Sequence, residues 1–375
     1  MVCYLSSYKN NPIKEYFFAR ITKEKNNVVS ILSADLNAAY IDEKNHTVTF
    51  FPFESVYEIS EHEQKNWFTL AENDALAIEN TGVCRRFYCA EEDDATVLTG
   101  LACNTNCLMC PVSEGARLDA PTVQTDELLE QISYFGSALP HVTITGGEPT
   151  MLGVGLIDVI NKLHNHCPGV SVLLLSNGRA FSVQQYAQII NQAMKSQDQV
   201  AIPIHGSTAM AHDSITQVNG SFVQTIKGLN HLSAGKMHIE IRVVVSKLNS
   251  KDITNIAEFL CSKIQRISVV NFIGLEMCGN AAKNKSVVGI SYSEAAQSCE
   301  QAIPLLGEHG IDVGLYNFPL CTVNHSLWPL CKDSITDYKI RYAPECERCI
   351  VRSICFGVFD STLNSGIFKA KPILE

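Results

Sequence analysis

Between residues 95 and 274 the sequence repeats one pattern, a short apolar run followed by an amphipathic stretch. The apolar runs occupy residues 96–99, 141–145, 170–175, 199–204, 238–245 and 267–273. Between them, hydrophobic residues recur at helical spacing, as at Leu128, Leu129, Ile132 and Phe135. Strands that are apolar throughout, each followed by a helix, predict a parallel sheet covered by helices. Periodicity alone fits a partial barrel or an open sheet, and in both folds ligands bind at the carboxyl ends of the strands.

The segments on either side of this pattern are different. Residues 1–94 are expected to form a small β-rich domain that binds a peptide or a partner, with strands at 15–21, 27–32 and 46–51. The acidic run at 91–94 is expected to be a solvated loop, with a linker as the alternative. The barrel is expected over residues 95–290 and a cysteine-rich extension over 291–375. In that extension we expect a helix near 293–306, kinked or ended by Pro304, and a strand near 312–316.

Composition excludes several classes of function. The formal net charge is −10, which argues against a nucleic-acid binder. No signal-peptide pattern opens the sequence, and no apolar run approaches the roughly 18 residues of a membrane span, so we expect a cytoplasmic protein without membrane association. The fifteen cysteines are an odd number in a long chain, and reduced thiols that bind metal explain them better than disulfides do.

Three of the cysteines follow the first predicted strand of the barrel with the spacing C-x3-C-x2-C, at Cys103, Cys107 and Cys110. A structural zinc ion needs four ligands, and this loop supplies three, so a zinc site would need a remote fourth ligand. An iron–sulfur cluster bound by three cysteines would keep one iron open for another ligand. A cluster with an open iron is therefore the favoured interpretation.

This arrangement resembles the radical SAM superfamily, whose signature is the same spacing after the first strand of a partial (β/α)6 barrel. The resemblance covers about residues 96–274 and implies a 4Fe-4S cluster that binds S-adenosylmethionine (SAM). It also implies SAM contacts at the ends of successive strands: Gly146, Gly147, Glu148, Pro149, Ser176, Asn177, Ser207 and Arg242. The two glycines would let the backbone approach the ligand closely. Taken singly, each of these positions also fits an ordinary turn, cap or core-edge residue. His205 is expected to be a hydrogen-bonded histidine rather than a catalyst.

Five more cysteines lie late in the chain. Cys346, Cys349 and Cys355 have the spacing C-x2-C-x5-C, and Cys321 or Cys331 could supply a fourth thiolate. Four thiolates suffice for one 4Fe-4S cluster, and a zinc ion is the main alternative. The spacing resembles the SPASM and twitch extensions of peptide-modifying radical SAM enzymes. Because Phe359 stands where a full SPASM pattern has another cysteine, we expect one auxiliary cluster, with Cys321 as its preferred fourth ligand.

The tail looks closest to the His-Xaa-Ser system radical SAM maturases of the HxsC type, on motifs that include residues 319–321, 334–339 and 344–349. This resemblance implies reductive cleavage of SAM to a 5′-deoxyadenosyl radical and modification of a ribosomally made peptide with His-Xaa-Ser repeats. Expected partners are the precursor peptide, a reductant such as flavodoxin or ferredoxin, and a second maturase of the same system. The alternatives are a radical SAM enzyme acting on a small molecule and a metal-binding scaffold without turnover.

Overall fold

The computed structural model describes residues 1–5, 13, 15–333 and 339–374. Residues 334–338 of the tail motif lie outside this part. The chain divides into two compact units. The first contains residues 1–98, 123–144 and 154–172, and the second contains residues 99–122, 145–153 and 173–375. In the described residues, every helix is too short or too polar to cross a lipid bilayer.

The N-terminal part of the first unit is a seven-stranded, largely antiparallel sheet, which confirms the expected β-rich region. Its strand order is β1-β7-β6-β2-β3-β4-β5. The strands are β1 (Val2–Tyr4), β2 (Phe17–Thr22), β3 (Ala38–Asp42), β4 (Thr47–Phe51), β5 (Ser55–Glu58), β6 (Ala75–Ile78) and β7 (Val83–Tyr88). The pair β2–β3 is parallel, and the other pairs in this sheet are antiparallel.

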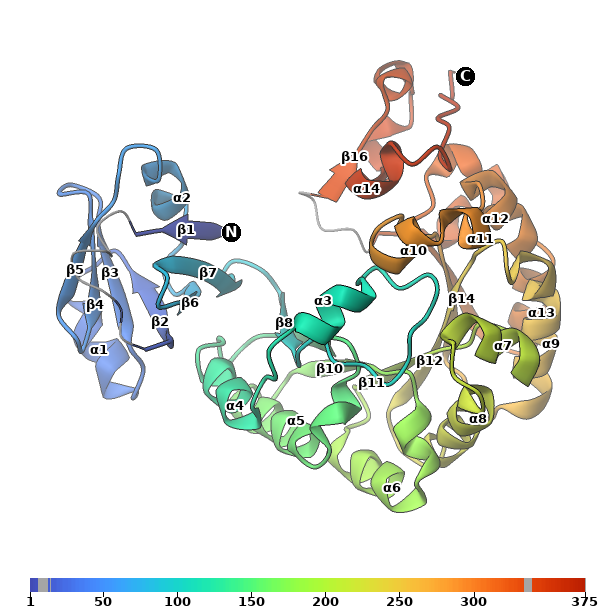
Figure 1. Cartoon of the computed structure of the whole chain (residues 1–375), viewed down its shortest axis with the longest axis horizontal. Coiled ribbons are helices and arrows are strands. Elements are labelled where there is room, and N and C mark those ends of the chain that lie inside the picture. The colour runs from blue at the N-terminus through green and yellow to red at the C-terminus, as the bar shows by residue number, and fades with distance from the viewer. Residues whose placement is uncertain (6–12, 14, 334–338, 375) are drawn as a thin grey trace. The chain divides into compact units, whose positions relative to one another are not determined.

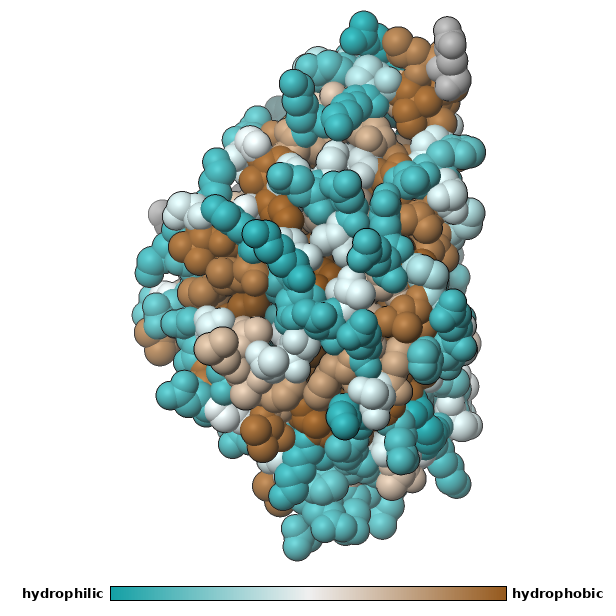
Figure 2. All heavy atoms as spheres, turned by 90° about the vertical axis from the view of Figure 1, so that its right-hand side faces the viewer, coloured by the Kyte–Doolittle hydropathy of each residue, from teal (hydrophilic) through white to brown (hydrophobic). Residues whose placement is uncertain are grey.

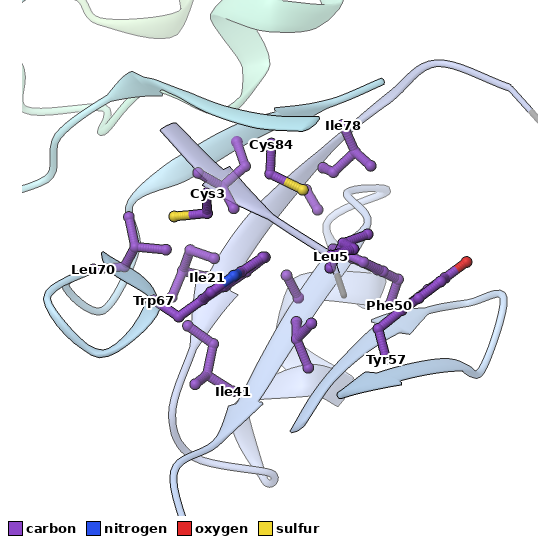
Figure 3. Close-up of a cluster of buried hydrophobic side chains, with 14 of the residues drawn as sticks. Cys3, Leu5, Ile21, Ile41, Phe50, Tyr57, Trp67, Leu70, Ile78 and Cys84 are labelled. Atoms are coloured by element: carbon purple, nitrogen blue, oxygen red, sulfur yellow. The ribbon is translucent and has the colours of Figure 1, made fainter. Parts of the chain in front are cut away.

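Alternate residues of these strands form a hydrophobic core under helix α2 (Gln64–Phe68). Figure 3 shows Trp67 of α2 beside the strand residues Ile21 and Ile41. Trp67 is fully buried, and its indole N–H donates to the carbonyl oxygen of Tyr4. A buried indole contributes a large apolar area to the core, and its polar N–H needs a hydrogen-bond partner, which it has here.

The expected strand over residues 27–32 is wrong, because this segment is helix α1 (Asn27–Ser33). The two apolar residues that α1 buries, Val28 and Ile31, are three positions apart. That spacing places both on one helical face, whereas a strand would have turned them to opposite sides. The run of β-branched residues suggested a strand, but tertiary packing favoured the helix.

Helices α4 (Thr125–Ser133) and α5 (Gly155–His166) and most of strand β9 (His141–Thr145) belong to the first unit as well. Tyr134, at the end of α4, is 1% exposed. Its hydroxyl donates to the carbonyl oxygen of Phe18 and accepts the backbone N–H of Asn37, and its own carbonyl oxygen accepts a bond from Arg20. The N-terminal sheet is thus joined to the start of the expected barrel segment by buried hydrogen bonds.

A second sheet has eight strands in the order β15-β14-β13-β12-β11-β10-β9-β8. Besides β9, its strands are β8 (Asp94–Leu98), β10 (Ser171–Leu175), β11 (Gln199–Pro203), β12 (His238–Val244), β13 (Val269–Ile273), β14 (Asp312–Tyr316) and β15 (Cys331–Lys332). Neighbouring strands from β10 to β15 are parallel. All six strands expected from the apolar runs are present within a few residues of their expected bounds.

In the second unit, helices cover the outer face of this sheet: α6 (Gln184–Ala193), α8 (Ser221–Leu232), α9 (Ile253–Lys263) and α13 (Ala302–Glu308), as Figure 1 shows. The buried residues of α9 are Ile253, Ile256, Ala257 and Leu260, which is the spacing of an amphipathic helix packed on a sheet. The molecular face on the side of α9 and α13 mixes hydrophilic and hydrophobic residues, with no single apolar surface (Figure 2).

The sheet continues beyond residue 290, where we expected the extension to begin. β14 pairs with β13, and β15 pairs with β14. The helix expected near 293–306 is two helices, α12 (Tyr292–Cys299) and α13, and the break lies before Pro304. Pro304 lies in the first turn of α13, where a proline costs no intrahelical hydrogen bond. Ser291 and Glu294 form a capping box that starts α12.

Candidate active site

The cysteine loop follows β8 and is bonded to the carboxyl end of β9. The backbone N–H of Gly147 donates to the carbonyl oxygen of Gly100 at 2.9 Å, and that of Glu148 donates to Ala102 at 2.8 Å. The loop therefore begins as an extension of the sheet edge, where parallel α/β folds place their ligands.

The two glycines of the Gly146-Gly147-Glu148-Pro149 segment are required by this close approach. Gly146 has a φ of +150°, and a Cβ at that position would collide with the carbonyl oxygen of Gly100. A Cβ at Gly147 would collide with the carbonyl oxygens of Leu101 and Ala102. The sequence suggested that backbone must come near a ligand here, and the neighbour that the structure places against the glycines is the cysteine loop itself.

Two of the three thiols share one hydroxyl group. The oxygen Oγ1 of Thr105 lies 3.2 Å from Sγ of Cys103 and 3.6 Å from Sγ of Cys107. Burial raises the pKa of Cys107 to about 11, and burial also raises the pKa of Cys110. Sequence reasoning did not identify Thr105, although its place between two candidate ligands is a usable signal. A hydroxyl in this position can donate to a thiolate and stabilise it.

Two asparagines from a much later segment of the chain form hydrogen bonds to the backbone of the cysteine loop. They lie in or beside the short helix α10 (Gly279–Lys283). The amide of Asn280 donates to the carbonyl oxygen of Cys107, and that of Asn284 donates to Leu108. The backbone N–H of Asn280 donates to Cys110 at 2.9 Å. These contacts could not be predicted from the sequence, because they join segments about 170 residues apart.

Glu148 is 2% exposed, and its carboxylate is the centre of a hydrogen-bond network. Oε1 accepts the hydroxyls of Ser176 and Thr150 at 2.7 and 2.6 Å, together with the backbone N–H of Thr150. Oε2 accepts the backbone N–H of Asn177 at 2.7 Å. Pro149 follows at the start of a 3₁₀ helix (Pro149–Leu152). Glu148 and Ser176, both expected near SAM, are thus bonded to each other across two strand ends.

Asn177 connects the same network to the cysteine loop. Its side-chain amide donates to Oδ1 of Asn104 at 2.6 Å, and its carbonyl oxygen accepts the hydroxyl of Thr225. Gly178, next in the chain, has a φ of +80°. The structure therefore brings the Glu148 segment, the Ser176–Asn177 turn and the cysteine loop together at one edge of the sheet.

Ser207 and Arg242 lie on neighbouring elements of the same unit, and both have protein partners. The backbone N–H and hydroxyl of Ser207 both donate to the carboxylate of Asp252, at 2.7 and 2.8 Å. Nε of Arg242 is 2.7 Å from Oε1 of Glu240, which is 2% exposed and also accepts the amide of Asn271. The ion pair holds the guanidinium in a fixed direction. Asp252, Glu240 and Asn271 were not expected from the sequence.

His205, at the end of β11, differs from the expectation of a satisfied histidine. It is 4% exposed, and its Nδ1 is buried with no hydrogen-bond partner among the described residues. Its backbone N–H donates to Nδ1 of His212. Burial and the neighbouring His212 lower the pKa of His205 to about 3, and burial lowers that of His212 to about 4. Both imidazoles are therefore neutral at physiological pH.

Four of the five tail cysteines line one cavity. Its walls include Cys321, Cys346, Cys349 and Cys355, with Arg341, Tyr342, Arg352 and Lys371 beside them. Two 3₁₀ helices, Pro344–Arg348 and Arg352–Ile354, place the last three cysteines on successive tight turns. Cys331 is absent from these walls, and its Sγ lies 3.8 Å from the carbonyl oxygen of Leu327. The geometry thus groups Cys321, rather than Cys331, with the three tail cysteines.

Within the described ranges, no three His, Cys, Asp or Glu side chains converge as they would around one metal ion. Three thiols lie on the loop, and four line the tail cavity. A structural zinc ion takes four ligands, and a 4Fe-4S cluster bound by protein alone takes four thiolates.

The remaining cysteines differ in burial. Cys3, Cys84, Cys167 and Cys299 are buried, as is usual for cysteines that bind no metal, whereas Cys89, Cys261 and Cys278 are partly exposed. Cys3 and Cys84 face each other in the register of β1 and β7, inside the N-terminal core (Figure 3). Sγ of Cys278 donates to the carbonyl oxygen of Pro111, one residue after the cysteine loop.

Comparison with known proteins identifies the barrel segment. Residues 97–260 match the radical SAM superfamily model. A relative named AdoMet-dependent heme synthase from Methanosarcina barkeri is 24% identical over 159 residues, covering 42% of this chain and 43% of that protein. One of the same name from Nitratidesulfovibrio vulgaris is 25% identical over 171 residues, covering 44% of each. The chain thus spans less than half the length of these curated relatives.

Solved structures similar to this chain include Streptococcus suis SuiB bound to precursor peptide SuiA, with a TM-score of 0.49 and 12% identity. That match covers 60% of this chain and 49% of SuiB. Another is anSMEcpe with bound AdoMet and the Kp18Cys peptide, with a TM-score of 0.45, 14% identity and coverage of 59% and 63%.

Proposed function

We propose that this chain, whose residues 97–260 form a radical SAM domain, reductively cleaves SAM and uses the resulting radical to modify a ribosomally made peptide. The observation that carries the proposal is the bonding of the three-cysteine loop to the end of β9, through Gly147 and Glu148. This bonding places a three-thiolate donor set beside the polar strand ends where a ligand of the open iron would lie.

In this proposal Cys103, Cys107 and Cys110 would hold a 4Fe-4S cluster with one iron left open for SAM. Once reduced by the external reductant, the cluster would supply the electron for cleavage of SAM to methionine and a 5′-deoxyadenosyl radical. The chain's own groups orient SAM. Gly146, Gly147, Glu148 and Pro149 form the wall beside its amino group, Ser176, Asn177 and Ser207 lie toward the ribose, and the free guanidinium nitrogens of Arg242 bind the carboxylate.

The Glu148 carboxylate acts mainly by binding other groups of the protein. Its four hydrogen bonds fix the Ser176–Asn177 turn relative to the cysteine loop. A carboxylate saturated in this way preorganises the pocket, since the groups around SAM need not rearrange when it binds.

The tail cavity is proposed to hold one auxiliary 4Fe-4S cluster, bound by Cys321, Cys346, Cys349 and Cys355. With four thiolates every iron has a protein ligand, so this cluster has no free position for substrate. The arrangement supports a role in electron transfer, for example in accepting an electron from the substrate radical.

The peptide substrate is proposed to carry His-Xaa-Ser repeats, as the tail motifs imply. We assign peptide or partner recognition to the N-terminal sheet. One edge strand, β1, is already covered, because the N–H of Tyr4 donates to Glu63 and its carbonyl oxygen accepts Trp67. The strand at the other edge of the order is β5, which is where an extended peptide could add to the sheet. The proposal places the protein in the cytoplasm, with flavodoxin or ferredoxin as reductant and a second maturase as a further partner.

The second candidate is a radical SAM enzyme that acts on a small molecule. The curated relatives named AdoMet-dependent heme synthase favour it, because their name refers to a small molecule and they match 42% and 44% of this chain. The two candidates share the SAM site and differ in the substrate.

The test is anaerobic reconstitution with iron and sulfide, followed by reaction with SAM, dithionite and a synthetic His-Xaa-Ser peptide. We expect 5′-deoxyadenosine and a peptide product of altered mass, with the Cys103→Ala, Cys107→Ala, Cys110→Ala triple variant as the inactive control. Formation of 5′-deoxyadenosine with an unchanged peptide would favour the small-molecule candidate. Absence of both from protein that holds its iron would favour a scaffold without turnover.

A further inference from the structure

Arg117 is clamped onto the cysteine loop from helix α3 (Glu114–Asp119). Its Nη1 donates to the carbonyl oxygen of Thr105 at 2.8 Å, and its Nη2 donates to Oδ1 of Asn106. Both acceptors lie between Cys103 and Cys107. A planar guanidinium that uses two nitrogens in this way has little freedom to move, so its charge stays beside the loop.

The charge of Arg117 is not neutralised by a neighbour. Across the part of the chain that the structure describes, Arg117 forms no ion pair with a carboxylate. Its Nε is buried and has no hydrogen-bond partner among those residues. A buried donor without an acceptor is costly, so this N–H has hydrogen-bonding capacity that a ligand bound at the loop would be able to use.

The two contacts of Arg117 lie next to the thiols. Thr105, whose carbonyl oxygen Arg117 binds, has its Oγ1 3.2 Å from Sγ of Cys103 and 3.6 Å from Sγ of Cys107. Asn106, whose Oδ1 is the second acceptor, directly precedes Cys107 in the chain. Arg117 is thus a fixed positive group bound to the residues between two of the three proposed ligands.

We propose that Arg117 is a positioning residue that raises the reduction potential of the cluster held by Cys103, Cys107 and Cys110. The inference rests on the proposed function for the existence of that cluster. Reduction adds one negative charge to the cluster, and a fixed cation nearby stabilises the reduced form more than the oxidised form. Net charge and hydrogen bonds to the sulfurs are the means by which a protein sets such potentials.

The test compares Arg117→Gln, which removes the charge, with Arg117→Lys, which keeps it without the planar fork. Arg179→Gln is the matched control, because Arg179 also donates to a loop carbonyl, that of Asn104, but makes its contacts in solvent-exposed positions where its charge is screened. Each loaded protein is titrated with reductant and followed by electron paramagnetic resonance. The relevant signal is the one that changes when SAM is added, which separates it from any tail cluster.

We expect the ratio of reduced to oxidised cluster at a given potential to fall about tenfold in Arg117→Gln, which for one electron is about 59 mV. Arg117→Lys should lie closer to the wild type, and Arg179→Gln should not differ from it. An unchanged potential in Arg117→Gln with full iron content would overturn the inference.

The iron content of the Arg117 variants is a second test of the inference. If Arg117→Gln loses the cluster while Arg117→Lys keeps it, the charge is what the cluster needs, as the inference requires. If both variants lose it and Arg179→Gln does not, Arg117 acts only as a clamp and the inference fails. A wild-type protein that binds iron without any SAM-responsive signal would instead refute the proposed function.

Discussion

The hydroxyl of Ser176 donates a 2.7 Å hydrogen bond to Oε1 of Glu148, joining the ends of β10 and β9. Both groups are nearly inaccessible to solvent, with exposures of 5% and 2%. Two residues expected to contact SAM are therefore also structural partners. Their substitution should change both the stability of the site and the binding of its ligand.

Glu148→Gln should destabilise the protein by about 3 kcal/mol, because hydrogen bonds to a buried charged group contribute about 1.5–3 kcal/mol each and an unpaired buried donor costs about 1–3 kcal/mol. An amide NH₂ in place of one carboxylate oxygen would face the donors of Ser176 and Thr150 or of Asn177. Urea unfolding under anaerobic conditions measures the effect. Ser176→Ala removes one donor and should cost less, about 1–2 kcal/mol. Equal losses in the two variants would show that the network is not centred on Glu148.

The buried pair His205 and His212 should make the protein sensitive to mild acid. The folded pKa of His205, about 3, lies below the ordinary value of 6.5. The unfolded chain therefore binds more protons than the folded chain as the pH falls below 6.5, and stability is lost in that range. From pH 7 to pH 5 the loss attributable to His205 is about 2 kcal/mol at about 1.36 kcal/mol for each pKa unit.

Thermal or urea unfolding of the wild type and of His205→Gln at the two pH values checks this expectation. The variant should have a shallower dependence of its unfolding free energy on pH. An equally steep dependence in both proteins would assign the acid sensitivity to other groups.

The tail cluster should be needed for peptide modification more than for SAM cleavage. Cys346 and Cys349 lie more than two hundred residues after the cysteine loop, and the loop carries its own three thiols. A variant with Cys346→Ala and Cys349→Ala should still form 5′-deoxyadenosine at a measurable rate and yield no modified peptide. Normal peptide modification by this variant would mean that the tail site only stabilises the fold, as a structural zinc site does.

Iron content should distinguish the fourth tail ligand. The wild type should bind about eight iron atoms in two four-iron clusters. Cys321→Ala should lose about half of them, because Cys321 lines the same cavity as the other three cysteines. Cys331→Ala should keep them, since Cys331 lies outside that cavity. The opposite pattern would mean that the tail rearranges around Cys331 when it binds iron.

The sequence predicted those features that depend on local pattern. The apolar strands and the cysteine spacing are of this kind, and β9 begins and ends at its expected residues. Contacts between distant segments were not predictable. Asn280 reaches Cys107 across 173 positions, and Arg117 acts on the loop from a short helix without a distinctive motif. The helix at α1 was missed because its β-branched residues favour strands locally, while packing decided otherwise.

The reason for the two glycines also needed the structure. Sequence alone indicated a close backbone approach at Gly146 and Gly147. It could not identify the neighbour, because the carbonyl oxygens of Gly100, Leu101 and Ala102 reach the glycines only through the pairing of two strand ends.

Cys103, Cys107 and Cys110 are proposed to form the site of SAM cleavage. The most direct measurement is 5′-deoxyadenosine, quantified by mass spectrometry after anaerobic reaction of the reconstituted protein with SAM and dithionite. We expect 5′-deoxyadenosine from the wild type, none from the triple alanine variant, and about half of the wild-type iron in that variant. A triple variant that kept all of its iron and still cleaved SAM would contradict this proposal.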